Sequence, residues 1–298
     1  MTVLFERVAI SGVGLIGGSL AKALKEKKIV GEILGVGRHE ERLQRAREDG
    51  IIDGYAAHLD ASLGGVDVVV VATPVGMIVD LTKKMIPFLK KGTIITDVGS
   101  VKKEIVREIT QFIPDTLHFV GAHPIAGTEN SGFEASFATL FENSTCVLTP
   151  VSTTSPVAVA KIKELWSRVG SNVVSMDCDR HDEILAAVSH LPHVIAYSMV
   201  NCLLKREGFE KTILSFSAGG FKDFTRIAAS HSEMWRDIIL MNRDKVLPAI
   251  ELFQDYLNEL KEAIEKGDGE KLFSEFQKSR TFKRLMKEKE VTPPSSEC

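Results

Sequence analysis

A glycine-rich segment between an apolar strand and an amphipathic helix constrains the fold of this chain most. In "VAISGVGLIGGSLAKALKEKK", residues 8–28, three glycines have GxGxxG spacing. Glycine permits a tight turn there and lets a pyrophosphate approach free N–H groups at the start of the helix. Because the flanking strand and helix are both present, the pattern predicts dinucleotide binding rather than a tight turn alone. The expected cofactor contacts are Gly12, Gly14, Leu15, Ile16 and Gly17.

Short β-branched runs alternate with helix-like segments from Arg7 to about Met176. One run, "VDVVVVAT" at residues 66–73, is apolar on both faces, which is typical of a strand in a sheet that helices cover on both sides. The alternation predicts an α/β fold with a Rossmann-type, mostly parallel, doubly wound sheet. We expect this dinucleotide-binding domain to cover residues 1–177.

Helical periodicity replaces the strand signal after about Asp177. It predicts an all-α substrate and dimerisation domain over residues 178–285, with Gly267 and Gly269 as helix stop signals. These helices carry more apolar surface than a domain of that size buries alone, so we expect a homodimer. The final residues, "VTPPSSEC", predict a disordered tail, which we place at 286–298.

Composition and charge argue against several classes of partner. The chain has 298 residues, is 44% hydrophobic and has a formal net charge of −3 without a long Lys/Arg block, which disfavours nucleic acid. It shows neither an apolar run of roughly 20 residues nor a signal-peptide pattern, so we expect a cytoplasmic protein without a membrane partner. The four cysteines lie far apart without CxxC pairing, which predicts reduced thiols and no metal site.

The end of the second strand bears on the choice of cofactor. An acidic residue there would hold the adenosine ribose of NAD, but this chain has Gly37 followed by Arg38. Glycine removes a carboxylate that would repel a 2′-phosphate, and arginine can pair with that phosphate. The pattern favours NADP, and the alternative is a solvated Arg38 with NAD as the cofactor.

Three further segments follow strands and are expected to open into the same crevice. "VATPVG" contributes Thr73, Pro74 and Val75 to the expected nicotinamide pocket. In "TDVGSVKKEI", Ser100 either caps a helix beginning at Val101 or points its hydroxyl at a substrate.

The third segment, "VGAHPIAGTENSG" at residues 120–132, has a composition typical of a loop. Its His123 is the first candidate for acid/base work, because histidine titrates near neutral pH and an alcohol oxidation needs an acceptor for the hydroxyl proton. The alternative is a loop histidine bonded to the backbone.

The helical part carries two polar groupings. His190 and His193 lie three residues apart, which favours a polar lining of the interdomain cleft or satisfied core groups over a metal site completed by His181 or Asp182. In "GGFKDFTRIAASHSEMWRD", Lys222 and Arg226 are expected on one helical face, where they invite an anionic group; a solvated charged face is the alternative. The glycines before them suggest a loop that admits something closely.

Taken in order, "GVGLIGGSLAKAL", "ATPV", "TDVGSVK", "GAHPIAGTENSG", "SHLPH" and "GGFKDFTRIAASHSEMWRD" resemble the prephenate/arogenate (cyclohexadienyl) dehydrogenase family of tyrosine biosynthesis. The resemblance runs from about Arg7 to Leu260, and the later motifs are more specific than the glycine fingerprint. It implies NAD(P)-dependent oxidative decarboxylation of prephenate to 4-hydroxyphenylpyruvate, or of arogenate to tyrosine.

The resemblance also implies roles for individual residues. His123 would accept the proton of the ring C4 hydroxyl, Ser100 would bond that hydroxyl or orient His123, and Arg226 would hold a substrate carboxylate. Trp235 is a candidate for reaching a neighbouring subunit's site. The polar lining of the cleft would comprise Thr128, Glu129, His193 and Lys222. We expect no chorismate mutase or regulatory ACT domain, and hence a monofunctional enzyme.

Two rival functions stay open at this point. One is another two-domain dehydrogenase of the β-hydroxyacid or imine-reducing kind, in which a lysine or aspartate on the interdomain helix would be catalytic. The other is a non-catalytic NADP-sensing module that binds a protein partner. The sequence also leaves prephenate and arogenate as alternatives, since Glu129 or Asp223 could favour the ammonium group of arogenate or pair with Lys222.

Overall fold

The computed structural model describes residues 2–128, 130, 132–205 and 215–290. Its sheet has eight strands in the order β3-β2-β1-β4-β5-β6-β7-β8. All neighbours pair in parallel except β6 and β7, which are antiparallel. The strands are β1 (Phe5–Ser11), β2 (Val30–Val36), β3 (Gly54–Ala56), β4 (Val68–Val71), β5 (Ile94–Asp97), β6 (His118–Ile125), β7 (Thr145–Thr149) and β8 (Asn172–Ser175).

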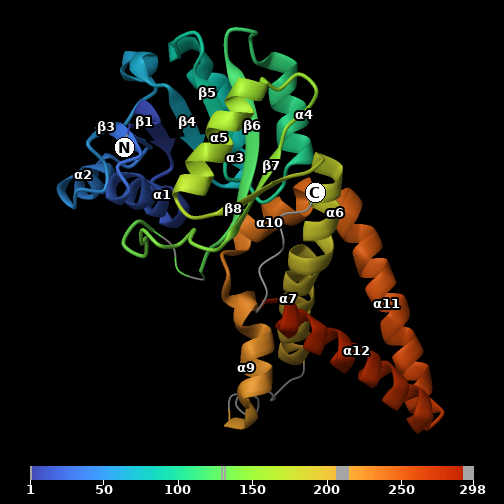
Figure 1. Ribbon diagram of the computed structural model, residues 1–298. Coiled ribbons are helices and arrows are strands. Elements are labelled where there is room, and N and C mark those ends of the chain that lie inside the picture. Colours follow the sequence, from blue (N-terminus) through green and yellow to red (C-terminus); the bar gives the residue numbers. More distant parts are fainter. Residues whose placement is uncertain (1, 129, 131, 206–214, 291–298) are drawn as a thin grey trace. The chain divides into compact units, whose positions relative to one another are not determined.

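Helices cover both faces of this sheet (Figure 1). In β4, Val68 and Val70 pack into one core with α1, α2 and α5, whereas Val69 and Val71 pack into a second core with α3 and α4. The doubly wound, mostly parallel fold expected from the alternating runs is confirmed. The helices between the strands are α1 (Leu15–Glu26), α2 (Glu40–Glu48), η1 (Ala61–Gly65), α3 (Val75–Met85), η2 (Ile86–Phe88), α4 (Lys103–Phe112) and α5 (Pro156–Arg168).

The described chain after β8 is helical. The elements are α6 (Cys178–Leu185), the π-helical turn η3 (Ala186–His190), α7 (Leu191–Leu204), α9 (Gly219–Thr225), the 3₁₀ turn η4 (Arg226–Ala229), α10 (Ser232–Met241), α11 (Arg243–Glu265) and α12 (Gly269–Glu290). Helix α6 contacts α4, and α10 contacts α3, so these helices pack on the sheet's second layer. That packing places helical side chains beside the crevice at the sheet.

One helical run, Cys178–Leu204, is long and apolar enough to cross a membrane by length and composition alone. Such a run also occurs in core helices, and 22% of its most apolar 18-residue stretch is buried. Its buried members include His181, Asp182 and His190, all at most 1% exposed. The run thus brings ionisable side chains into the protein interior against α4 and α10.

The chain divides into two compact units, Met1–Val246 and Leu247–Cys298. In the second unit, α11 and α12 are joined through Gly267, whose φ of 67° is in the left-handed region. The Tyr256 hydroxyl donates a hydrogen bond to Glu275 across this pair at 3.0 Å. Large apolar side chains of these helices remain exposed, among them Leu252, Leu257, Phe273, Phe276 and Phe282.

Candidate functional site

The glycine turn after β1 forms a cradle at the start of α1. A Cβ on Gly12, whose φ is 97°, would lie 2.5 Å from the carbonyl oxygen of Ala72, and a Cβ on Gly17 would lie 2.1 Å from the Gly12 carbonyl oxygen. Gly14, by contrast, has open space around its Cβ direction and is the N-cap of α1 without a side-chain cap. Two glycines thus serve close packing, and the third faces a space where an anion would meet the free N–H groups of Leu15, Ile16 and Gly17.

The loop after β4 adjoins this cradle. The Thr73 methyl carbon would lie 3.0 Å from a Cβ on Gly12, and the Thr73 hydroxyl is buried without a hydrogen-bond partner in the described chain. Pro74 is the N-cap of α3, which begins at Val75. An unpaired buried hydroxyl beside an open helix N-terminus fits a dinucleotide that supplies the missing partner.

Arg38 lies just beyond the carboxyl end of β2 and is exposed. Gly37 before it donates its N–H to the Ala56 carbonyl at 3.2 Å, so the chain passes β3 at this point. The side chain of Arg38 is therefore at the correct edge of the sheet for the adenosine end of a dinucleotide.

His123 belongs to β6 rather than to a loop, which corrects the expectation from its glycine- and proline-rich surroundings. It pairs with Val147 of β7, whereas the pairing of β6 with β5 ends at Val120. Beyond that point the Asp97 carboxylate accepts the Ala122 N–H at 3.1 Å, and Lys102 Nζ donates to the Ala122 carbonyl at 2.9 Å. Side chains thus replace the missing strand and hold the segment before His123.

Asp97 and Lys102 form a fully buried ion pair. Asp97 also accepts the Gly99 N–H at 2.9 Å, so the pair ties the loop containing Ser100 to β6. Removing one member of such a pair would leave an uncompensated charge in the interior. The pair therefore acts as a clamp between the two segments that carry Ser100 and His123.

Two residues considered at the sequence level only as alternative metal ligands bond directly to His123. Its Nδ1 lies 2.9 Å from Nε2 of His181, and Nδ1 of His181 lies 2.7 Å from Oδ1 of Asp182. Asp182 also accepts the backbone N–H groups of Lys102 and Lys103 at 2.8 and 3.0 Å. The three side chains form a continuous hydrogen-bonded row from the end of β6 to the N-terminus of α4.

The environment keeps His123 neutral. Burial, followed by the charges of His181, Lys102 and His190, holds the pKa of His123 well below its usual range. Its Nε2 makes no hydrogen bond within the described chain, and 8% of the residue's surface stays exposed to solvent. An unprotonated ring nitrogen that solvent can reach is what a proton acceptor requires.

Ser100 does not cap α4. The helix begins at Lys103 with Lys102 as its N-cap, and the carboxylate of Asp182 bonds to the N–H groups there. The Ser100 hydroxyl is half-buried and makes no hydrogen bond within the described chain. Of the two expected roles, the cap is wrong, because a carboxylate from a distant helix takes the position.

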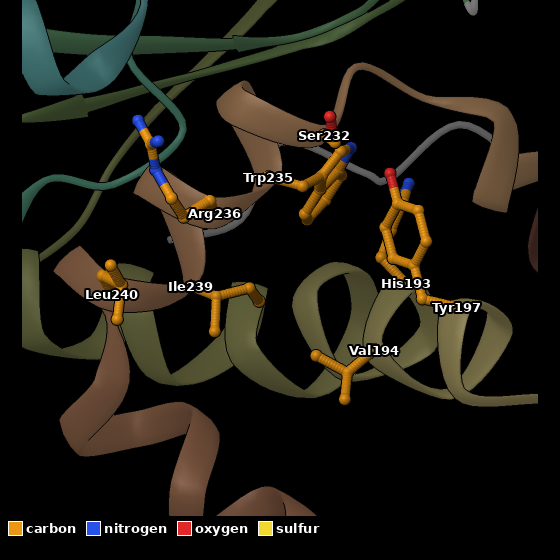
Figure 2. Close-up of a pocket in the computed structure, with 8 residues that line it drawn as sticks. All are labelled: His193, Val194, Tyr197, Ser232, Trp235, Arg236, Ile239 and Leu240. Carbon is orange, nitrogen blue, oxygen red and sulfur yellow. The ribbon is translucent and has the colours of Figure 1, made fainter. Parts of the chain in front are cut away.

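His193 and Trp235 come together in a pocket between α7 and α10. Their rings stack with centroids 3.4 Å apart, and His193 Nδ1 donates to the Ser189 carbonyl at 2.8 Å. Figure 2 shows side chains of α7 facing those of α10. The pocket between them has a volume of about 350 Å³. Burial lowers the pKa of His193. The lining comprises His193, Val194, Tyr197, Ser232, Trp235, Arg236, Ile239 and Leu240.

Lys222 and Arg226 do not share one regular helix face. Lys222 is exposed on α9, whereas Arg226 begins the 3₁₀ turn η4 after that helix has ended. Gly219 and Gly220 form the first turn of α9 rather than a loop, which corrects that expectation. Arg226 is close enough to His193 to contribute, after burial and the Ser189 hydrogen bond, to the pKa of that histidine.

The segment after β6 carries the last two expected site residues. Thr128 is exposed and accepts the N–H of Asn130 at 3.2 Å. Glu129 lies outside the described residues. The structure therefore brings together two groups, His123 with its row and His193 with Trp235, and leaves Thr128 and Lys222 on the surface.

Known protein families were compared with the chain. Residues 20–175 match the family model described as "Prephenate dehydrogenase, nucleotide-binding domain". Residues 177–278 match the one described as "Prephenate dehydrogenase, dimerization domain". Together the two matches cover most of the sequence in the order expected from its motifs.

Individual relatives agree with the family models. The chain is 36% identical to a cyclohexadienyl dehydrogenase of Zymomonas mobilis over 96% of this chain and 98% of that protein. It is 34% identical to a prephenate dehydrogenase of Bacillus subtilis over 95% of this chain and 76% of that protein.

A solved structure gives the same result. The Aquifex aeolicus prephenate dehydrogenase in complex with hydroxyphenyl propionate and NAD+ is 38% identical, with a TM-score of 0.88, over 94% of this chain and 98% of that chain. The resemblance inferred from the motifs is confirmed, and neither rival function is favoured. The chain belongs to the prephenate dehydrogenase family, the oxidoreductases that join a nucleotide-binding Rossmann domain to a dimerization domain and serve tyrosine biosynthesis.

Proposed function

We propose that this protein oxidises and decarboxylates prephenate, arogenate or both, with His123 as the proton acceptor. The observation that carries the proposal is the neutral, solvent-accessible Nε2 of His123 at the carboxyl end of β6, in the same sheet as the glycine cradle of β1. Ligands of open α/β sheets bind at that edge. The Aquifex relative holds NAD+ and hydroxyphenyl propionate, an aromatic acid of similar size to the expected products.

The proposed reaction gives each group of the chain a defined task. A bound nicotinamide supplies the acceptor for the hydride that leaves ring carbon C4. His123 Nε2 takes the proton of the C4 hydroxyl, the ring carboxylate leaves as CO2, and its bonding electrons complete the aromatic ring. The C4 oxygen is then a phenolate, and His123 returns the proton to it, which gives the phenol and the neutral imidazole. The unpartnered hydroxyl of Ser100 would bond the same C4 oxygen and so orient it toward His123.

Other residues of the chain would hold the substrate. Arg226 offers a guanidinium for a substrate carboxylate, and its proximity to His193 supports a place at the same cleft. Trp235 supports His193 by stacking and, in a dimer, is a candidate for the neighbouring subunit's site. The remaining proposed contacts are Thr128, Glu129 and Lys222.

For the cofactor, we infer a preference for NADP over NAD. Support comes from the exposed guanidinium of Arg38 at the adenosine end of the cradle and from Gly37, which leaves no carboxylate to repel a 2′-phosphate. The NAD+ held by the Aquifex relative is the reason to test both nucleotides.

The test is a matrix of initial rates that combines prephenate or arogenate with NAD or NADP. Turnover with at least one substrate supports the reaction, and a higher rate with NADP than with NAD supports the role of Arg38. A strong NAD preference overturns the inference about Arg38 alone. If folded protein that still binds nucleotide shows no turnover in any of the four combinations, the proposed reaction is overturned and the sensing module is favoured.

The organisation of the protein is also a proposal. We place the domain boundary at residues 177/178 and the enzyme in the cytoplasm with the biosynthetic reactions it would serve. The helical domain was expected at 178–285, but α12 continues to Glu290, which shortens the expected tail of 286–298. The exposed apolar side chains of α11 and α12, together with the match to a dimerization domain, support a homodimer. Sedimentation velocity that shows a monomer at micromolar concentration would contradict the homodimer.

A further inference from the structure

The row from His123 through His181 to Asp182 determines where its protons lie. Asp182 accepts two backbone N–H groups at the start of α4, where the helix dipole stabilises an anion. Its oxygens therefore act as acceptors, and the proton between Asp182 and His181 belongs to Nδ1 of His181.

The proton on Nδ1 of His181 determines the direction of the hydrogen bond between His181 and His123. A neutral imidazole with its proton on Nδ1 has only a lone pair on Nε2. With a neutral His181, the 2.9 Å contact is a bond that Nδ1–H of His123 donates to Nε2 of His181. His123 is left with an unprotonated Nε2, the nitrogen that solvent can reach.

From this geometry we propose that His181, held by Asp182, is a positioning residue that fixes His123 in the Nδ1-protonated tautomer. The inference rests on the proposed function, in which Nε2 of His123 takes the substrate's hydroxyl proton. His181 touches neither of the reacting atoms in this account. It acts through His123, both by setting the tautomer and by restraining rotation of the ring.

The charges around the row suit this role. Lys102, the nearest cation to His123, is paired with Asp97, so its charge is locally balanced. His190 is the other titratable neighbour, and its buried ring favours the neutral form. When His123 takes up a proton, the nearest carboxylate in the row is that of Asp182, on the far side of the His181 ring. The row therefore orients the ring of His123 without placing a carboxylate next to its Nε2.

A direct test reads the tautomer in the protein without substrate or cofactor. Two-bond ¹H–¹⁵N correlation spectra of histidine-labelled protein distinguish a protonated ring nitrogen from an unprotonated one. The signals of His123 are assigned by their loss in His123→Asn. We expect His123 and His181 both to carry their protons on Nδ1. A His123 protonated on Nε2 in the folded protein overturns the proposal.

Kinetics of two variants separate positioning from a general structural effect. His181→Leu removes the acceptor and should lower kcat about 10- to 100-fold, the range typical of partners that orient functional histidines, with little change in KM. His181→Gln offers an amide oxygen to Nδ1–H of His123 and should recover much of the lost kcat. The control is Asn242→Leu, which removes buried hydrogen bonds to His190 and to the Asp182 backbone carbonyl but leaves the side-chain hydrogen bonds of the row in place.

The outcomes are distinct. Wild-type kcat in His181→Leu, or a glutamine variant no better than the leucine variant, overturns the positioning role. If the leucine variant does not fold, the wild-type spectrum and the glutamine variant still decide. If the spectrum shows the expected tautomer but no substrate–cofactor combination gives turnover, the proposed reaction is overturned instead. The failure of the positioning role and the failure of the proposed reaction are therefore distinguishable.

Discussion

Two buried histidines on either side of Asp182 differ in which nitrogen they leave unpaired. His123 reaches the Asp182 side chain through His181, and its remaining Nε2 is accessible. His190 reaches the Asp182 backbone carbonyl through Asn242, and its remaining Nε2 is sealed without a partner. Burial alone therefore does not distinguish a reactive histidine from a packed one; the position of the free nitrogen does.

Hydrogen bonding also determines which ring nitrogen of His190 carries the proton. Asn242 Nδ2 donates to the Asp182 carbonyl at 2.9 Å, so this atom is the amide nitrogen, and His190 Nδ1 at 3.0 Å is its acceptor. The proton of neutral His190 then lies on Nε2, and the ring packs edge-on against Trp235. Such a ring supports the pocket wall and offers no lone pair to a substrate.

The largest effect is expected on kcat, from a substitution of His123. His123→Asn removes the proposed proton acceptor while keeping a polar side chain of smaller volume. It should lower kcat about 10²- to 10⁴-fold, the usual contribution of general acid/base catalysis, with little change in KM. Steady-state rates with the preferred substrate and cofactor check this, and an unchanged kcat would remove His123 from the mechanism.

A change on the His190 side should affect stability rather than turnover. Asn242→Leu leaves His190 Nδ1 and the Asp182 carbonyl without their shared donor, which should reduce the free energy of unfolding by about 1–3 kcal/mol. Urea denaturation measures the loss, and kcat should stay within roughly threefold of wild type because the His123 row is intact. A large fall in kcat at unchanged stability would contradict the distinction between the two sides.

Near neutral pH, the smallest effect is the dependence of stability on the titration of His190. Burial lowers the pKa of His190 to about 4, whereas an unfolded histidine titrates near 6.5. Below about pH 6.5, His190 binds a proton in the unfolded chain but stays neutral in the folded protein. The free energy of unfolding therefore falls by about 1.4 kcal/mol per pH unit as the pH is lowered to about 4.

The His190→Gln variant lacks this titration and should lose stability less steeply over the same pH interval. Its amide oxygen can still accept from Asn242, which keeps the comparison close to one group. Thermal unfolding at several pH values between 4 and 7 measures both slopes. Equal slopes in the two proteins would show that His190 is protonated in the folded state as easily as in the unfolded one.

Local sequence patterns predicted much of the fold. The glycine fingerprint and the apolar runs located β1, β2 and β4 to β8, because parallel strands buried on both faces have a distinctive composition. β3 was missed because it has only three residues at the sheet edge and no apolar run of its own. The antiparallel β6–β7 pair was not predicted either, since no local pattern specifies strand direction. Helix α12 lies mostly within the predicted helical domain but continues to Glu290, into the residues expected to be a disordered tail.

The site was predictable only in part. His123 was found from its position after a strand, but its partner His181 lies 58 residues away, and no spacing rule connects them. The cap of α4 shows the same limit, since Asp182 comes from 79 residues beyond Lys103 and takes the place expected for Ser100. Contacts of this range depend on how α6 packs against α4, which the sequence patterns do not encode.

The placement of His123 within β6 has a consequence for how substrate range can change. A strand in a ladder, braced by the Asp97–Lys102 clamp, keeps the proposed proton acceptor in register with β7. Arg226 instead starts a short 3₁₀ turn at the end of a seven-residue helix. Under the proposed function, substitutions in α9 and η4 would change which substrate side chain is held while the histidine row stays in place, which makes that segment the place to begin directed evolution.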